Sequence, residues 1–412
     1  MKNLQTQTTL SAARMPLGKP VLGWLCGLGI KSLGTAVFLT AIIWEATKYG
    51  VEFASFIAML SSLVTMAFLL IGGHLSDALR PRKMMLLASV FLSVILAAGM
   101  LWSVASGGNE IQLVVLTVST GLYGAVSAPA AATLTRELTS IQAFPRALSI
   151  EQSLNQLTQV VGRPFGGLLV GIGGFALASG VNILTVAAII VSLLVIPSNP
   201  ERLNRPKIAF MTALRESAGL ASRQPVLRIT VLTTGVVAGF LIPFTVLIIP
   251  LWARASGESP LTAGMAMGAV AGGALFVTAY ASIRGTFNRL GATACIGIFI
   301  AAIGMILFVL SSGVWAFGAA FIVGLGQGIY ISHGAPLVRA GVPMDSMGRV
   351  QAILALVQSL LMTLCLPLLG MLSKGGNPYP ALWTMSFALI LIAIIAISTK
   401  SFREATLASL EQ

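Results

Sequence analysis

Two basic side chains and a stripe of amides interrupt stretches of the sequence that are otherwise apolar. Lys31 lies about ten residues into the first apolar stretch, roughly 15 Å deep for a helix that rises 1.5 Å per residue. Gln152, Gln156, Gln159 and Arg163 are spaced i, i+4, i+7 and i+11, so on a helix they share an arc of about 60°. Charged groups are costly in hydrocarbon and usually face a cavity or another helix. These residues are therefore candidate ligands for a solute.

The acidic residues indicate which charge such a solute would carry. Only Glu151 falls within an apolar stretch, about one helical turn from its end. A site for a cationic drug would need a buried carboxylate to offset desolvation. Because Lys31 and Arg163 have no acidic residue at their depth, we expect an anionic or carboxylate-rich solute. The structural alternative is that Lys31 bonds to helix carbonyls and the glutamines only hold helices together.

Other apolar stretches carry further candidate contacts, although Tyr and Gln are also typical of hydrogen bonds between packed helices. These candidates are Thr35 in the first span, Tyr123 and Ser127 in the fourth, Phe240 in the seventh, Gln327 and Tyr330 in the tenth and Gln358 in the eleventh. Glu151 and His333 are candidate proton carriers, because a carboxyl group in a span or an imidazole can exchange a proton near neutral pH.

The stretches that hold these residues are long enough to cross a membrane. The chain has 412 residues, 56% hydrophobic and 9% charged, against about 25% charged in soluble proteins, which excludes an ordinary soluble domain. The apolar runs are continuous rather than alternating, which excludes a β-barrel. The sequence predicts an all-α membrane protein with twelve transmembrane helices in two six-helix bundles. The predicted spans are 21–44, 53–72, 84–105, 111–134, 147–172, 177–197, 229–251, 261–282, 290–312, 314–337, 350–373 and 379–398.

The net charge of +13 indicates orientation rather than a nucleic-acid partner. With the N-terminus inside, basic residues gather in the inner loops, and the outer loops hold only Lys48, Arg254 and Lys374. Short cytoplasmic loops normally hold this excess. We therefore expect both termini in the cytoplasm, the lipid bilayer as surroundings, and no nucleic-acid partner.

The two halves of the chain look like repeats. Arg80 matches Arg284 at an offset of 204 residues, and Arg146 matches Arg349 at an offset of 203. We expect an N-terminal bundle over 1–198, a basic cytoplasmic linker over 199–228 and a C-terminal bundle over 229–412. Transporters built from repeated halves bind solutes near the membrane midplane and alternate access by rocking.

The sequence offers little for other chemistry. The three cysteines lie singly in apolar stretches, so neither a disulfide framework nor a metal site is predicted. We find no HExxH, GxSxG or P-loop pattern. We therefore expect no enzyme, no cofactor and no nucleotide-driven pump, but a monomer driven by an ion or solute gradient.

Two motifs resemble those of the major facilitator superfamily. Residues 73–77 (GHLSD), followed by the basic cluster 80–83, resemble its loop motif, with Ala78 in place of the usual basic residue and Arg80 in place of a glycine. Residues 162–167 (GRPFGG) resemble its antiporter motif, with Arg163 where proline is usual. The resemblance implies a gating role for Asp77, Arg80, Arg82 and Arg136 at the inner face.

Residues 128–148 and 213–225 are similar to the bacterial branch that contains the enterobactin exporter and macrolide efflux pumps. This resemblance implies export of a bulky small molecule across the inner (plasma) membrane, often a siderophore or a drug and commonly by proton antiport. Together with the missing buried carboxylate, it favours an anionic or amphipathic solute such as a siderophore. The alternatives are a multidrug or macrolide-type efflux pump, and then a lipid flippase, a channel or a membrane-embedded enzyme.

Overall fold

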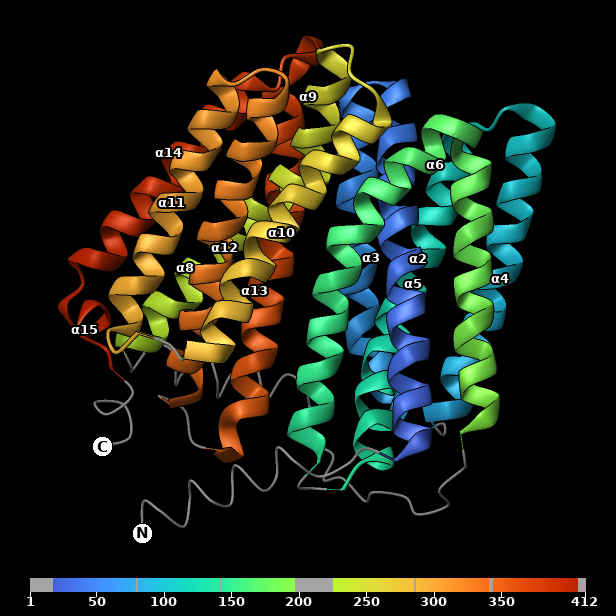
Figure 1. Ribbon diagram of the computed structural model, residues 1–412, viewed down its shortest axis with the longest axis horizontal. Coiled ribbons are helices and arrows are strands. Elements are labelled where there is room, and N and C mark those ends of the chain that lie inside the picture. The colour runs from blue at the N-terminus through green and yellow to red at the C-terminus, as the bar shows by residue number, and fades with distance from the viewer. Residues whose placement is uncertain are drawn as a thin grey trace. The chain divides into compact units, whose positions relative to one another are not determined.

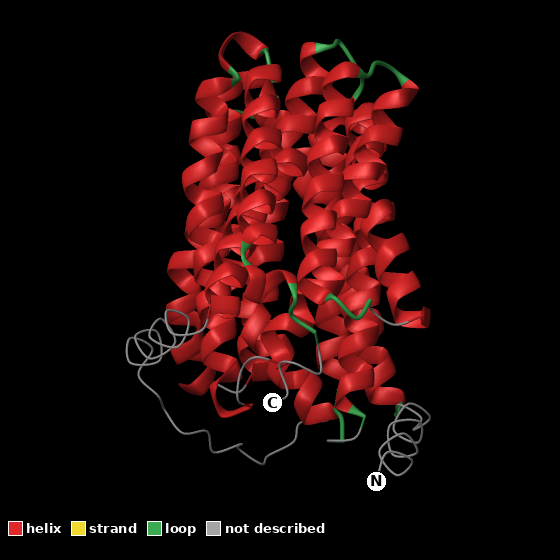
Figure 2. Ribbon diagram, turned by 90° about the vertical axis from the view of Figure 1, so that its left-hand side faces the viewer, coloured by secondary structure: helices red, strands yellow, loops and turns green. Residues whose placement is uncertain are grey.

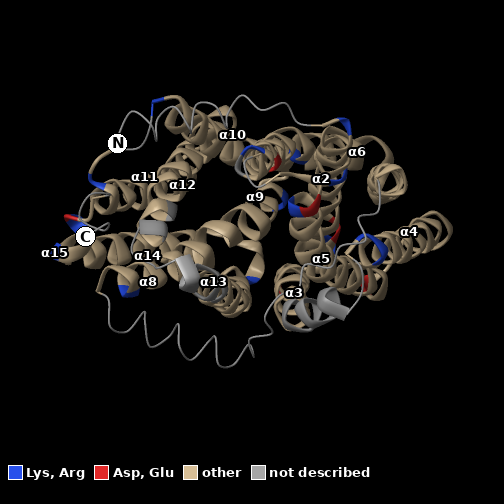
Figure 3. Ribbon diagram, turned by 90° about the horizontal axis from the view of Figure 1, so that it is seen from below, with Lys and Arg blue, Asp and Glu red and all other residues tan. Residues whose placement is uncertain are grey.

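The computed structural model is almost entirely helical in the part of the chain that it describes (Figures 1 and 2). Helices are expected here, since only a helix satisfies the backbone groups of a single apolar segment within that segment. Charged residues are sparse along the helices (Figure 3). The described residues are 18–78, 81–140, 143–196, 225–284, 287–340 and 344–406.

The helices of the first half agree with the predicted spans to within a few residues. Between the third and fourth spans, Gly107 and Gly108 adopt φ values of 74° and 80°, and the Asn109 side chain then accepts a hydrogen bond from the Gln112 backbone N–H. This cap starts the next helix where the sequence predicts it. The helices are α2 (Lys19–Ala46), η1 (Thr47–Tyr49), α3 (Val51–Ala78), α4 (Pro81–Ser106), α5 (Glu110–Leu138) and α6 (Phe144–Val195).

Helix α6 contains both the fifth and the sixth predicted span. It is 52 residues long, and its backbone leaves the helical conformation at Gly173 and at Gly174, where φ is 66°. A residue with a Cβ atom rarely adopts this left-handed conformation. The break therefore lies where the sequence places the turn between two spans, and the 11 long apolar helices of the described residues accommodate twelve predicted spans.

The second half again follows the predicted spans, with one departure from α-helical geometry in the seventh. Directly after Pro243, residues Phe244–Ile248 form a π-helical turn, in which the Ile249 N–H donates to the Phe244 carbonyl. The helices are α8 (Pro225–Pro243), η2 (Phe244–Ile248), α9 (Ile249–Ala255), α10 (Pro260–Arg284), α11 (Leu290–Leu310), α12 (Val314–Ala340), α13 (Met344–Leu372), η3 (Lys374–Gly376), α14 (Tyr379–Ser398) and α15 (Lys400–Arg403).

The chain forms two compact units. Unit 1 comprises 1–42 and 67–204, and unit 2 comprises 43–66 and 205–412. Helices α2 and α3 therefore each pass from one unit into the other. The segment 43–66, which contains the turn between the first two spans, packs with the second half of the sequence.

Within unit 1, helices α2 and α6 approach each other closely. A Cβ atom added at Gly162 would lie 2.8 Å from the Ala36 Cβ, and one added at Gly166 would lie 2.7 Å from the Val37 carbonyl oxygen. Small residues permit such contacts between membrane helices, where hydrocarbon gives no hydrophobic driving force for association. Both glycines belong to the motif GRPFGG, so in this structure part of that motif has a packing role.

Unit 2 is built around α12, which packs against α10 and α11. Gly324 lies against the Val270 backbone on α10, Gly326 against the backbone of Gly297 and Ala301 on α11, and Gly328 against Ala274 on α10. Glycines at every second position thus let one helix contact two neighbours at backbone distance. This packing gives the glycine-rich stretch of α12 a structural role.

Candidate functional site

Lys31 lies on α2 next to an aromatic ring of α5. Its Nζ atom is 4.7 Å from the centroid of the Tyr123 ring, a distance at which a cation is attracted to the ring face. The Lys31 side chain is half-buried. Within the described ranges, no carboxylate pairs with it, and no hydrogen bond of its ammonium group is found. The structure thus gives Lys31 an aromatic neighbour without neutralising its charge.

Tyr123 is held in place for this contact. It is only 4% exposed, and its hydroxyl lies 3.4 Å from the Ser89 Oγ, which itself donates to the Met85 carbonyl oxygen. Ser127, one turn further along α5, is buried as well. The Thr35 hydroxyl donates to the Lys31 carbonyl oxygen at 2.9 Å, so its proton is used within its own helix and only its oxygen is free to accept a bond from a solute.

Arg163 is the second cation, and its hydrogen bonding is incomplete. Its Nε donates to the Gln159 Oε1 at 2.9 Å. Its Nη1 is buried and has no hydrogen-bond partner among the described residues. A guanidinium carries five N–H donors and usually finds planar acceptors for them. Further along the stripe Gln156 is half-buried and Gln152 is exposed, so the stripe is open at one end.

A polar seam between α2 and α6 sets the relative heights of the two cations. The Ser32 hydroxyl donates to the Asn155 Oδ1 at 3.0 Å, and the Thr158 hydroxyl donates to the Ser32 Oγ at 2.9 Å. Gly162, beside Arg163, packs against Leu33 and Ala36. Arg163 therefore lies only about one helical turn along α2 from Lys31. The spacing of these residues in the sequence does not indicate this seam.

Glu151 ends a short chain of polar groups in unit 1. The Trp24 indole N–H donates to the Thr135 Oγ1 at 2.9 Å, and the Thr135 hydroxyl lies 3.3 Å from the Glu151 Oε2. Trp24 is fully buried, whereas Glu151 is half-buried. The carboxyl group is thus connected to the helix interior on one side and partly accessible on the other, as a proton carrier would need to be.

The candidate solute contacts in unit 2 differ in how deeply they are buried. Tyr330 is 6% exposed, and its hydroxyl lies 2.8 Å from the Thr234 Oγ1 and donates to the Thr233 Oγ1 at 3.2 Å. These bonds join α12 to α8, a packing role that is typical of Tyr between membrane helices. Phe240 and Gln327 are half-buried, and Gln358 is exposed.

His333 is buried, with 3% of its surface exposed, and both ring nitrogens have backbone partners. Its Nε2 accepts from the Phe287 N–H at 3.2 Å, and its Nδ1 lies 2.9 Å from the Ile329 carbonyl oxygen. The Phe287 ring stacks on the imidazole.

The predicted gating residues are only partly described. Arg80 and the side chain of Asp77 lie outside the described residues, and Arg136 is exposed. Arg82 has partners that the motif did not suggest, because its Nε donates to the Leu193 carbonyl oxygen at 2.7 Å and its Nη2 to that of Leu194 at 3.0 Å. Arg82 thus caps the end of α6, where unpaired carbonyls and the helix dipole favour a cation.

Comparison with known proteins identifies the family of the chain. The model of the Major Facilitator Superfamily matches residues 24–366. The chain belongs to the major facilitator superfamily. Members of this superfamily are transporters that bind small-molecule substrates within the membrane. The predicted twelve-helix fold is confirmed.

Individual members of the superfamily resemble the chain over nearly its whole length. The multidrug efflux pump Tap of Mycolicibacterium fortuitum is 23% identical over 399 residues, covering 91% of this chain and 94% of that protein. A peptide transporter in complex with sulfate gives a TM-score of 0.72 at 12% identity, covering 96% of this chain and 98% of that one. A bacterial homologue of the iron transporter ferroportin gives 0.71 at 13% identity, covering 93% and 99%. These structural likenesses establish the superfamily fold.

Proposed function

We propose that this superfamily member exports an anionic or amphipathic small molecule, such as a siderophore, across the bacterial inner membrane by alternating access. In this proposal the protein works as a monomer with both termini in the cytoplasm. The observation that carries it is the buried Nη1 of Arg163, which has no hydrogen-bond partner among the described residues. Burying a charge without a partner is costly, and an anionic solute would offset that cost on entering.

Lys31 and Arg163 would act on such a solute in different ways. The guanidinium can donate two parallel bonds to a carboxylate or a catecholate. The ammonium on the Tyr123 ring is a point charge next to an aromatic surface, which suits an acidic group attached to an aromatic ring. Thr35, Ser127, Gln152 and Gln156 would add hydrogen bonds around the solute, and Phe240, Gln327, Tyr330 and Gln358 are the proposed contacts from the second half.

The alternative function is efflux of drugs, as the printed name of the relative Tap describes for that protein. Neutral macrolide-like compounds would not require a carboxylate, so the site chemistry is compatible with them. A cationic drug fits less well, because the described spans place no carboxylate beside Lys31 or Arg163.

A deletion strain grown under iron limitation distinguishes the two functions. We expect the strain to retain a siderophore inside the cell and to recover its export when the gene is restored. The measurement is the siderophore concentration inside and outside the cells by mass spectrometry. Unchanged siderophore export together with increased sensitivity to drugs would overturn the leading proposal in favour of drug efflux.

We further propose that Glu151 carries the proton in an antiport cycle. Glu151→Gln should abolish export driven by a pH gradient in inverted membrane vesicles and should leave solute exchange without a gradient nearly intact, because glutamine keeps the shape and the Thr135 contact but cannot release a proton. His333→Gln is the matched variant. Loss of gradient-driven export in His333→Gln alone would assign the proton to His333 instead.

A further inference from the structure

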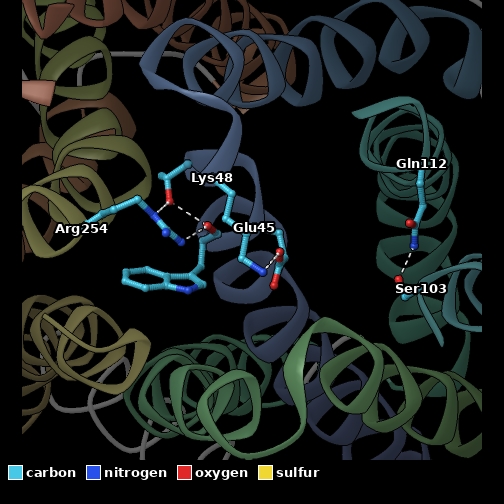
Figure 4. A network of polar contacts seen from close by, with 7 residues as sticks. Glu45, Lys48, Ser103, Gln112 and Arg254 are labelled. Carbon is cyan, nitrogen blue, oxygen red and sulfur yellow. Dashed lines mark hydrogen bonds and ion pairs between the residues drawn. The ribbon is translucent and has the colours of Figure 1, made fainter. Parts of the chain in front are cut away.

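Arg254 on α9 makes three contacts with the turn that follows the first span. Its Nε donates to the Thr47 Oγ1 at 2.5 Å, and its Nη2 donates to the Trp44 carbonyl oxygen at 3.1 Å. Its Cζ lies 4.4 Å from the centroid of the Trp44 ring. Figure 4 shows the side chain pointing toward the turn that carries Glu45 and Lys48. We call Trp44, Thr47 and Arg254 the outer latch, since the proposed orientation places them on the outside.

The outer latch is built into the end of α2. The carbonyls of the last helical turn have no partner within the helix, and Arg254 supplies one for Trp44 while placing a positive charge at the negative end of the helix dipole. Trp44 and Thr47 are 7% and 5% exposed. The buried Glu45 forms an ion pair with Lys48 at 2.6 Å and also attracts Arg254 electrostatically.

Other contacts hold the same segment against the second half of the sequence. The Ser62 hydroxyl lies 2.9 Å from the Thr363 Oγ1 and 3.5 Å from the Ser359 carbonyl oxygen. Ser55 lies so close to Gly370 that an added Cβ would overlap its side chain. These contacts explain why 43–66 belongs to unit 2, although α2 begins and α3 ends in unit 1.

We propose that the outer latch closes the outer side of the transport path and must open in every cycle. A transporter made of two repeated halves separates helices of those halves on one side of the membrane at a time. The outer latch joins the first span to the seventh, one from each half of the sequence. It uses a cation–π contact and two single hydrogen bonds rather than a bidentate ion pair with a carboxylate, a combination that can break and re-form reversibly.

Spin labels on cysteines introduced at Tyr49 and Ser256 test this proposal. Both residues are exposed and lie beside the outer latch, so the distance between the labels follows its opening. In purified protein without solute, we expect Arg254→Gln to raise the population with the long distance by about fivefold or more. Arg254→Lys, which keeps the cation over the ring, should lie between Arg254→Gln and wild type.

Lys48→Gln is the matched control, because it removes a positive charge from the same turn without touching Arg254. It should not raise the population with the long distance, because Glu45 without its Lys48 partner still attracts Arg254. If Arg254→Gln does not fold, Thr47→Val removes a single acceptor and should shift the distances in the same direction by a smaller factor. Unchanged distances in folded Arg254→Gln or Thr47→Val protein, or an equal shift in Lys48→Gln, would overturn the proposal. Since no solute is present, these outcomes do not depend on which molecule is exported.

Discussion

Arg163→Met should abolish export and yet leave the protein as stable as wild type or more stable. Methionine has a similar length, and it removes a buried cation whose Nη1 has no hydrogen-bond partner among the described residues. Replacing a buried charge by an apolar group of similar size is often neutral or stabilising. A hydrogen bond from the guanidinium to the solute would contribute about 3 kcal/mol to binding. Its loss corresponds to roughly a hundredfold weaker binding.

The measurement combines export in vesicles, solute binding and thermal unfolding of the same purified variants. Lys31→Met should weaken binding too, by a smaller factor, because Lys31 donates as a point charge and not in a planar fork. Lys83→Gln is the control, since it removes an exposed cation in the first turn of α4. Wild-type binding and export in Arg163→Met would contradict the proposed site, and a large loss of stability would show that Arg163 is structural.

The second large effect is expected at Gly324, where α12 packs against the backbone of α10. Gly324→Ala would place a Cβ atom against the Val270 carbonyl oxygen and backbone, which cannot move without shifting the helix. We expect a loss of more than about 3 kcal/mol in unfolding free energy, and little folded protein for Gly324→Leu. Thermal unfolding and size-exclusion chromatography in detergent would measure both effects.

Gly318 provides the matched control on the same helix. A Cβ atom added there meets nothing within 4 Å, and alanine favours a helix over glycine by up to about 1 kcal/mol. Gly318→Ala should therefore be neutral or slightly stabilising. If Gly324→Ala unfolds at the same temperature as Gly318→Ala, the close packing of α10 and α12 does not limit the stability of unit 2.

The fold was largely predictable because the need to satisfy backbone hydrogen bonds in the membrane acts within each local segment. Each long apolar run must satisfy its backbone internally, so its length and its polar ends define a helix. Even the break within α6 was predictable, because Gly173 and Gly174 interrupt the apolar pattern at the length of one span. The same periodicity placed Gln159 and Arg163 on one face, and the structure joins them by a hydrogen bond.

Contacts between distant residues were not predictable in this way. Ser32 and Thr158 are small polar residues of a kind common in membrane helices, and nothing in their spacing shows that they bond to each other. Arg254 stood in the sequence as a single basic residue in an outer loop, and its partner Thr47 lies 207 positions away. His333 is a candidate proton carrier in the sequence, and nothing in its spacing shows that the Phe287 backbone and ring cover it. These outcomes depend on which helix faces lie against each other.

The π-helical turn at Phe244–Ile248 also determines the direction in which Arg254 points. Its bond from the Ile249 N–H to the Phe244 carbonyl spans five residues instead of the four of an α-helix, so the turn contains one residue more than α8 alone would supply. Each residue advances a helix by about 100°. Without the extra residue, α9 would present a different face to the first span and Arg254 would point away from Trp44. The outer latch therefore depends on how the π-helical turn rotates the end of the seventh span, as well as on the side chains in contact.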